Sequence, residues 1–267
     1  MKHLTKIYLS LIFIFLYAPI FVLIALSFNE SRSRATWTGF TFHWYAQLFQ
    51  DSAIMEALSN TLSIAVISAL AATIIGTAAA IGINSLRRRP KAVIMNITNL
   101  PVLNPDIVTG ISLMILFIFS FNILKMGRLG FMTVLLSHIT FNIPYVILSI
   151  LPKLRQLDKN LYEAALDLGA KPSYAFFKVI LPEIMPGVVT GAILAFTLSL
   201  DDFIVTFFTT GTGVNTLSTL IYSMARRGVN PTINALSTIM FLVVLILLYL
   251  INARNATEEK KQTQNNN

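Results

Sequence analysis

The stretch EAALDLGAKPSYAFFKVILP, from Glu163 to Pro182, decides how the rest of this sequence is interpreted. Around its start, apolar residues recur at the spacing of one helix face, namely Leu161, Ala164, Ala165 and Leu168. Gly169 favours the left-handed conformation that ends many helices, and Pro172 favours the start of a second short helix that Pro182 should stop. Two short helices joined at a glycine suit insertion into a groove on a partner, although an amphipathic loop can also lie on a membrane surface.

The chain around this stretch is too apolar for a water-soluble globule. Its 267 residues are 55% hydrophobic and 12% charged, whereas soluble domains carry about 25% charged residues. The mean hydropathy of +0.71 agrees, and we therefore expect an integral membrane protein. The sequence contains no cysteine, which excludes a disulfide framework and a thiolate metal site.

Sequence signatures of nucleotide binding and catalysis are missing. The chain has no G-x-x-x-x-G-K-[ST] phosphate loop, so it cannot bind ATP in that manner. It also has no H-E-x-x-H or G-x-S-x-G motif. We accordingly expect a chain that is not an enzyme and holds neither a cofactor nor a metal.

Six apolar runs approach the length of about 20 residues that a helix needs to cross a hydrocarbon layer of roughly 30 Å. They cover residues 7–28, 62–83, 95–121, 131–151, 188–208 and 233–251. The third run is clean only from Ile107 to Phe121 and must extend back through Asn104 and Pro105. Since no regular alternation suggests a barrel, we expect an all-α polytopic membrane protein, with a transmembrane domain over residues 1–252 and a polar tail over 253–267.

Lysine and arginine predict the orientation, because short cytoplasmic loops are enriched in them. With the N-terminus inside, the cytoplasmic segments hold fourteen: Lys2, Lys6, Arg87, Arg88, Arg89, Lys91, Lys153, Arg155, Lys159, Lys171, Lys178, Arg254, Lys260 and Lys261. The outer loops hold six: Arg32, Arg34, Lys125, Arg128, Arg226 and Arg227. Both termini and the long loop 152–186 are therefore expected in the cytoplasm. The net charge of +8 is then explained by the basic cytoplasmic segments, and it does not indicate nucleic-acid binding.

Small residues mark where the helices can approach closely, because lipid provides no hydrophobic drive for helix association. The second run carries a stripe at four-residue intervals, formed by Ser68, Ala72, Gly76 and Ala80. The fifth run opens with a GxxxG motif at Gly187 and Gly191. Each pattern could form a seam within the chain or an interface with another subunit.

The quoted stretch resembles the EAA loop of permeases from ATP-binding-cassette (ABC) importers. The matching residues are Glu163, Ala164, Ala165, Gly169, Leu181 and Pro182. Val179 stands where isoleucine is usual, which is a mild departure. The resemblance implies a MetI-like fold of six transmembrane helices with cytoplasmic coupling helices. It also implies that the loop docks on a separate ATPase, with Glu163 bonding to that subunit and Gly169 permitting the elbow.

The resemblance continues through the later spans and is strongest to permeases of spermidine/putrescine importers. The matching stretches are PDIVTGISL, LLSHITFNIPYVI, FTLSLDDFIVTFFTTG, IYSMARRGV and INALSTI. The chain departs after the fifth span, where Gly211-Thr212 and Leu217-Ser218 replace the usual Gly-Pro and Leu-Pro, and Asn215 replaces an expected acid. These departures bear on substrate preference and not on architecture.

The resemblance implies ATP-driven polyamine import across a bacterial inner membrane. The implied partners are two copies of an ATPase, a second related permease chain and an extracytoplasmic polyamine-binding protein. Six spans are too few to enclose a pathway easily, which agrees with a second permease chain. ATP-driven closure of the ATPases would pull on the coupling loops and rotate the spans between outward and inward states.

Three acids are candidate contacts for a cationic substrate. Asp201 and Asp202 lie roughly 20 Å along the fifth span from Gly187, and a carboxylate within the membrane should face a cavity or a partner. Consecutive helical residues point about 100° apart, so at most one of the pair should face a pathway. The other interpretation is that one of them caps or bonds a neighbouring span. Asp106 follows the interruption of the third span and could be a second contact or an N-terminal cap.

Two further assignments remain open. A lone histidine within a span, His138, more often makes an interhelical hydrogen bond than a proton relay, and we assign it no role. The cargo could also be another small cationic or metal-chelate solute. A carrier driven by an ion gradient is a further alternative, although it would need buried ionisable relays and usually inverted repeats.

Overall fold

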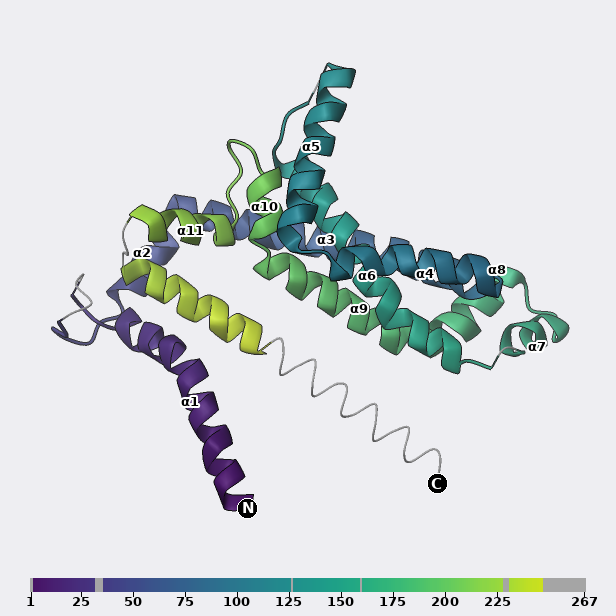
Figure 1. Ribbon diagram of the computed structural model, residues 1–267, viewed down its shortest axis with the longest axis horizontal. Helices are drawn as coiled ribbons and strands as arrows, with labels where there is room; N and C mark the ends of the chain where they lie inside the picture. Colours follow the sequence, from purple (N-terminus) through teal and green to yellow (C-terminus); the bar gives the residue numbers. More distant parts are fainter. Residues whose placement is uncertain (1, 32–35, 126, 159, 228–230, 247–267) are drawn as a thin grey trace. The chain divides into compact units, whose positions relative to one another are not determined.

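The computed structural model describes residues 2–31, 36–125, 127–158, 160–227 and 231–246, and the described chain is almost entirely helical (Figure 1). The α-helices are α1 (Lys2–Ser27), α2 (His43–Gln50), α3 (Ser52–Ser85), α4 (Arg88–Leu103), α5 (Asp106–Leu124), α6 (Phe131–Gln156), α7 (Leu161–Asp167), α8 (Pro172–Ala175), α9 (Leu181–Asp201), α10 (Ile204–Thr209) and α11 (Leu217–Arg227). A π-helix, Phe176–Ile180, joins α8 to α9, and a further helix covers Pro231–Ile246. The expected all-α class is confirmed.

Five of the described helices are long and apolar enough to cross a membrane. They are Tyr8–Ser27, Ser52–Ser85, Asp106–Leu124, Phe131–Gln156 and Pro172–Asp201. The sixth expected span, 233–251, begins in the shorter apolar helix Pro231–Ile246. Its remaining residues and the expected tail, 253–267, lie outside the described residues.

The chain forms two compact units, which comprise residues 1–57 with 219–267, and residues 58–218. In the first unit, Trp44 of α2 is buried and its Nε1 donates a hydrogen bond to the backbone oxygen of Asn29 at 2.7 Å. The ring of Phe28 contacts the rings of Phe40, Phe42 and Tyr45. The loop stretch and the three acids singled out by the sequence all belong to the second unit.

The core of the second unit lies where α6 packs against α9 and α3. A Cβ added at Gly191 would lie 3.2 Å from the Val146 Cα atom, and one at Gly187 would lie 3.2 Å from the Ile150 Cα atom. A Cβ at Gly76 of α3 would lie only 2.7 Å from Val146. The GxxxG motif and the stripe of small residues are therefore seams within the chain, where missing side chains let backbones approach.

The third apolar run does not form one helix over residues 95–121, as the sequence predicted. It divides into α4 and α5, with Asn104 in an extended conformation between them. The physical cause is Pro105, which cannot donate a backbone hydrogen bond and disfavours helical geometry in the residue before it. The described span begins at Asp106, while α4 is a separate helix with no buried residue.

The loop 152–186 is shorter than predicted, because both neighbouring helices extend into it. α6 continues past Pro152 to Gln156, and Pro182 does not end the second short helix. Instead, the Leu181 N–H bonds to the Phe176 carbonyl five residues back, in a π-turn that leads directly into α9. A wider turn just before a proline accommodates the missing N–H and the ring without ending the helix.

The fifth span also differs from the predicted continuous run, 188–208. α9 ends at Asp201, and Asp202 adopts an extended conformation with ψ of 127° before α10 begins at Ile204. α10 packs against α5 and α6. An added Cβ on Gly110 of α5 would lie 3.3 Å from the Val205 Cα atom, so this small residue allows the close contact. The break places two acids at a helix end within the second unit.

Candidate coupling surface and substrate pathway

Gly169 ends α7 as the sequence predicted. Its φ of +86° lies in the left-handed region that glycine adopts without strain. The Ala170 N–H donates to the Ala165 carbonyl at 3.1 Å, and the Gly169 N–H donates to the Leu166 carbonyl at 2.8 Å. This pair of bonds is the Schellman motif, which satisfies carbonyl groups at a helix end. The chain therefore turns from α7 towards α8 without needing a partner to hold the elbow.

One side of α7 is open to a partner. Leu168 is 90% exposed, and Glu163 and Ala164 are also exposed. The inward side is half-buried and consists of Leu161, Ala165 and Leu166. It is thus rotated from the predicted apolar face, since Ala164 and Leu168 point outward. We call the exposed residues Glu163, Ala164 and Leu168 the coupling surface, after the candidate role that the resemblance to the EAA loop implies.

The other residues of the motif have different positions. Leu181 is half-buried against the core of the second unit, and Pro182 is exposed where the π-helix joins α9. Their contribution is therefore to join the loop to a transmembrane helix, while Glu163 and Ala164 lie on the outer side of α7. The motif therefore has two parts: exposed residues on α7, and residues that connect the loop to α9.

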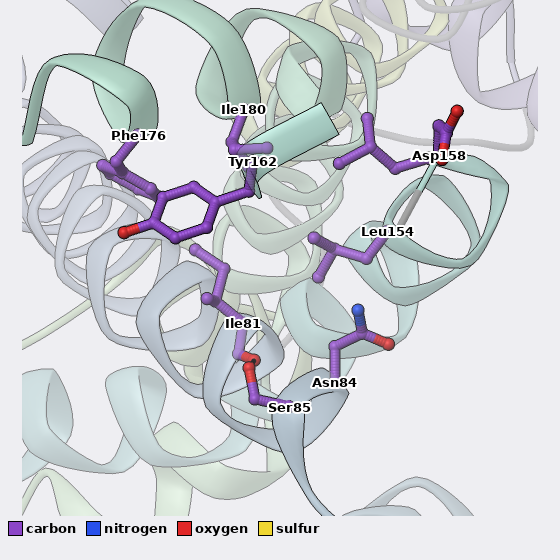
Figure 2. A pocket seen from close by; sticks show the side chains of 9 residues that line it. Ile81, Asn84, Ser85, Leu154, Asp158, Tyr162, Phe176 and Ile180 are labelled. Carbon is purple, nitrogen blue, oxygen red and sulfur yellow. Dashed lines mark hydrogen bonds between the residues drawn. The ribbon is translucent and has the colours of Figure 1, made fainter. Parts of the chain in front are cut away.

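A cavity of about 490 Å³ separates α7 from the ends of the spans behind it. Figure 2 shows the Tyr162 ring beside Phe176 on one side of it and Leu154 and Asp158 on another. The remaining lining comes from Ile81, Asn84, Ser85, Leu157 and Ile180. α7 therefore meets α3 and α6 across a partly open space and not across a continuously packed interface.

Among the three candidate acids, Asp202 is the one whose carboxylate bonds within the protein. Its Oδ1 accepts a hydrogen bond from the Val205 N–H at 3.2 Å, and its Oδ2 accepts bonds from the Thr206 N–H and the Thr206 hydroxyl, both at 2.7 Å. These are bonds to the first turn of α10, where the backbone N–H groups lack helical partners. Among the predicted alternatives, the geometry of Asp202 is that of a cap.

Asp201 and Asp106 are placed differently from Asp202. Both side chains are exposed, Asp201 as the last residue of α9 and Asp106 as the first residue of α5. No side-chain cap bond forms at the start of α5, although the negative charge of Asp106 is favourable in a first turn. Asp201 thus lies next to the break before α10, and Asp106 lies at the start of α5, against which α10 packs.

His138 of α6 links the elements around this break. Its ring is 1% exposed, and its nitrogens share hydrogen bonds with the Ser199 hydroxyl of α9 and the Thr206 hydroxyl of α10. Its Nε2 also lies 3.4 Å from Asp202 Oδ2. The expectation of interhelical hydrogen bonding is confirmed. The sequence contained the His and Asp residues, but their contact depends on the unforeseen turn at Asp202.

Comparison with known proteins identifies relatives over nearly the full chain. A putrescine transport system permease protein, PotI of Escherichia coli K12, is 40% identical over 94% of this chain and 90% of its own length. The spermidine/putrescine transport system permease protein PotC of the same organism is 40% identical over 90% of this chain and 89% of its own length. PotC of Haemophilus influenzae is 38% identical over 91% and 93% of the two chains.

Solved structures agree on the fold. A chain of a bacterial ABC transporter involved in alginate import superimposes with a TM-score of 0.71 at 18% identity, over 96% of this chain and 95% of that one. A chain of the MetNI methionine ABC transporter gives a TM-score of 0.58 at 20% identity, over 79% and 98% of the two chains. The MetI-like permease fold is thereby confirmed.

The family assignment rests on a match that covers most of the chain. The family profile described as "Binding-protein-dependent transport system inner membrane component" matches residues 72–256. This segment contains the coupling surface, the break between α9 and α10, and four of the five long apolar helices in whole or in part. This chain therefore belongs to the family of inner-membrane components of binding-protein-dependent transport systems, as a multi-pass membrane protein.

Proposed function

We propose that this chain is a permease subunit of an ATP-driven importer of polyamines, with spermidine or putrescine as cargo. It forms the transport pathway together with a second permease chain. Two copies of an ATPase bind at the coupling surface, and an extracytoplasmic binding protein delivers the polyamine. The observation that carries the proposal is the 40% identity to two polyamine permeases over at least nine-tenths of the chain.

The coupling role is supported by the geometry of α7. The coupling surface presents a carboxylate, Glu163, and a leucine, Leu168, that is 90% exposed. A leucine this exposed beside a charged residue suits burial in a groove of another protein. Movement of α7 by the ATPases passes through the elbow at Gly169 to the continuous helical segment Pro172–Asp201. Free energy of ATP binding then reaches the helix that carries Asp201.

The cargo assignment is supported by the two exposed acids. A polyamine carries an ammonium group at each end of an aliphatic chain, so it needs carboxylates to replace lost hydration. Asp201 is exposed at the end of α9, next to the break before α10, and Asp106 is exposed at the start of α5, which packs against α10. We assign to them the role of pathway contacts, and we assign to Asp202 the internal cap described above.

The proposed orientation places both termini and α7 in the cytoplasm of the cell. Fourteen of the twenty lysine and arginine residues fall on that side, as the enrichment of basic residues in cytoplasmic loops requires. In this orientation the coupling surface is accessible to an ATPase, and the break after Asp201 lies towards the outer side, where cargo enters.

Uptake assays test the proposal. The chain is expressed with its second permease, ATPase and binding protein in cells that lack other polyamine uptake routes, and labelled putrescine and spermidine are supplied. We expect saturable uptake that unlabelled polyamines suppress and that is lost when the ATPase is inactivated. An assembled complex that takes up neither compound would contradict the polyamine assignment.

The same cells separate the competing assignments. Competition by a different small cation or a metal chelate, without competition by polyamines, would favour another cargo for the same type of importer. Uptake that collapses with the ion gradient while cellular ATP is maintained would favour a gradient-driven carrier. The proposed importer keeps its activity under that second condition, because ATP alone drives it.

A further inference from the structure

The break between α9 and α10 needs an explanation, because it interrupts a helix within an apolar segment. α10 has six residues, which is too short for a helix to be stable through its own hydrogen bonds. Its position must therefore be fixed by contacts with other elements. The Thr133 hydroxyl of α6 donates to the Thr209 carbonyl at the end of α10, at 2.7 Å. The start of α10 is held by Asp202, Thr206 and His138.

One hydrogen-bond direction at the start of α10 follows from the Thr206 hydroxyl, which has a single proton to donate. The Thr206 hydroxyl donates to Asp202 Oδ2 at 2.7 Å, so its oxygen must accept the bond it shares with His138 Nε2 at 2.9 Å. His138 Nδ1 shares a hydrogen bond with the Ser199 hydroxyl, which in turn lies 3.0 Å from the Ser68 hydroxyl; the Ser68 hydroxyl also donates to the Ala65 carbonyl at 3.3 Å.

The result is a continuous chain of hydrogen bonds from α3 to the break. It runs from Ser68 through Ser199, His138 and Thr206 to the carboxylate of Asp202, where the Thr206 hydroxyl donates to Oδ2. Ser68, Ser199, His138 and Thr206 are all buried. Buried networks in which every member is satisfied fix one geometry, because the alternative is an unpaired polar group in a low-dielectric interior.

We infer that His138 is a positioning residue, which fixes the α9–α10 break so that, of the two adjacent acids, Asp202 serves as the cap and Asp201 offers its carboxylate to the cargo. The ring joins Ser199, before the break, to Thr206, after it. Asp202 uses both oxygens inside the protein, and its side chain is only 10% exposed, whereas Asp201 is exposed. This role rests on the proposed function, because the cargo contacted by Asp201 is the polyamine proposed above.

Kinetics of the assembled importer test the role through KM. We expect His138→Ala to raise the KM for putrescine about tenfold, which corresponds to a loss of about 1.4 kcal/mol of cargo binding when Asp201 is no longer held in place. His138→Gln, which keeps a donor for Thr206, should restore most of the affinity. Ser137→Ala is the matched control, because Ser137 is equally buried in α6 and its hydroxyl bonds to Thr133 in the same helix.

A double substitution distinguishes positioning from general destabilisation. If His138 acts through Asp201, the KM effect of His138→Ala should disappear in an Asp201→Asn background. Independent effects that multiply in the double variant would overturn the role, because a merely structural defect does not depend on the residue at position 201. A KM for His138→Ala equal to that of Ser137→Ala would also overturn it.

Cysteine labelling tests the break without relying on polyamine transport. The chain has no native cysteine, so a single introduced thiol is the only target on it for a small cationic methanethiosulfonate reagent. We expect Asp201→Cys to react and Leu200→Cys, whose parent side chain is 3% exposed, to stay unreactive. His138→Ala should make Leu200→Cys reactive, whereas Ser137→Ala should not. An unreactive Asp201→Cys, or a Leu200→Cys indifferent to His138, would overturn the inference.

The two experiments also separate this inference from the proposed function. If the unaltered complex does not transport polyamine, the proposed function fails, while the labelling pattern still reports whether His138 fixes the break. If transport occurs but His138→Ala has no effect on KM or labelling, the inference fails and the proposed function stands.

Discussion

At the scale of single residues, Asp201 and Asp202 are adjacent in the sequence but have separate environments. Asp201 is exposed at the end of α9, and no bond of α10 depends on it. We predict that Asp201→Asn raises the KM for polyamine uptake and leaves the amount of assembled complex unchanged. Initial uptake rates over a range of substrate concentrations, together with the yield of purified complex, provide the measurement. An unchanged KM would contradict the pathway role.

Asp202→Asn should have a different consequence. An amide has one acceptor oxygen, so it cannot replace both carboxylate oxygens that hold the first turn of α10. The expected loss of stability is about 1–3 kcal/mol, the range for a buried donor that is left without its hydrogen bond. Thermal melting of the purified complex should show a larger decrease for Asp202→Asn than for Asp201→Asn. Equal decreases would show that Asp202 is not the cap.

Gly169 offers a test of the coupling elbow by conformation alone. Its φ of +86° disfavours any other residue, and an added Cβ would meet nothing within 4 Å. Gly169→Ala should therefore cost about 1–2 kcal/mol of backbone strain without a steric clash. We predict weaker co-purification of the ATPase with the permease. Gly82→Ala is the control, since it also adds a methyl group into open space but lies within α3.

At the scale of secondary-structure elements, the π-helix before Pro182 determines how α8 is oriented relative to α9. Pro182→Ala restores a backbone N–H and permits a regular α-helix through this segment. Removing a π-turn rotates the preceding residues by about 100° relative to α9. We predict that ATP hydrolysis persists while transport per ATP decreases. Pro186→Ala, in the regular part of α9, should keep the normal ratio of transport to hydrolysis.

The elements that could be predicted from the sequence are those determined by residues close together in the chain, such as long apolar runs and single glycines. Long apolar runs predicted the helices that contain Tyr8–Ser27 and Ser52–Ser85, and Gly169 predicted the end of α7. The turn at Asp202 could not be predicted in this way. It is stabilised by His138, sixty-four residues earlier in the chain, and a tertiary contact of this kind leaves no periodic pattern in the surrounding apolar run.

The prolines indicated where a helix becomes irregular, but they did not indicate whether the helix ends there. Pro105 interrupts a helix, so that α5 starts at Asp106, and the sequence indicated this irregularity. Pro182 was expected to have the same effect, yet the helix continues through a π-turn. The difference depends on whether packing makes continuation favourable, and the core contact of Leu181 on α9 does so here.

At the scale of the whole molecule, the distribution of charge predicts a topology that cysteine labelling can test. A single Arg128→Cys should react with a membrane-impermeant maleimide in intact cells, because its loop is expected outside. Arg88→Cys should react only after permeabilisation. The cysteine-free sequence makes each signal specific to the introduced site. The reverse pattern would place the coupling surface outside and contradict its role in binding an ATPase.

The candidate sites could be predicted in part from the sequence. The motif from Glu163 to Pro182 indicated a coupling loop, and the helix end at Gly169 has the expected form. The division of labour between Asp201 and Asp202 could not be predicted, because a helical wheel separates adjacent residues only while the helix continues. It depends on a turn that brings one carboxylate under the first turn of α10.

The central claim is that ATP, and not an ion gradient, drives polyamine movement through this permease. The complete complex is reconstituted in proteoliposomes with ATP on the side of the coupling surface, and the binding protein and labelled spermidine are placed on the opposite side. We predict accumulation of spermidine that requires hydrolysable ATP and continues when ionophores abolish all ion gradients. Accumulation without ATP, or its loss with the ion gradients while ATP is present, would contradict the account.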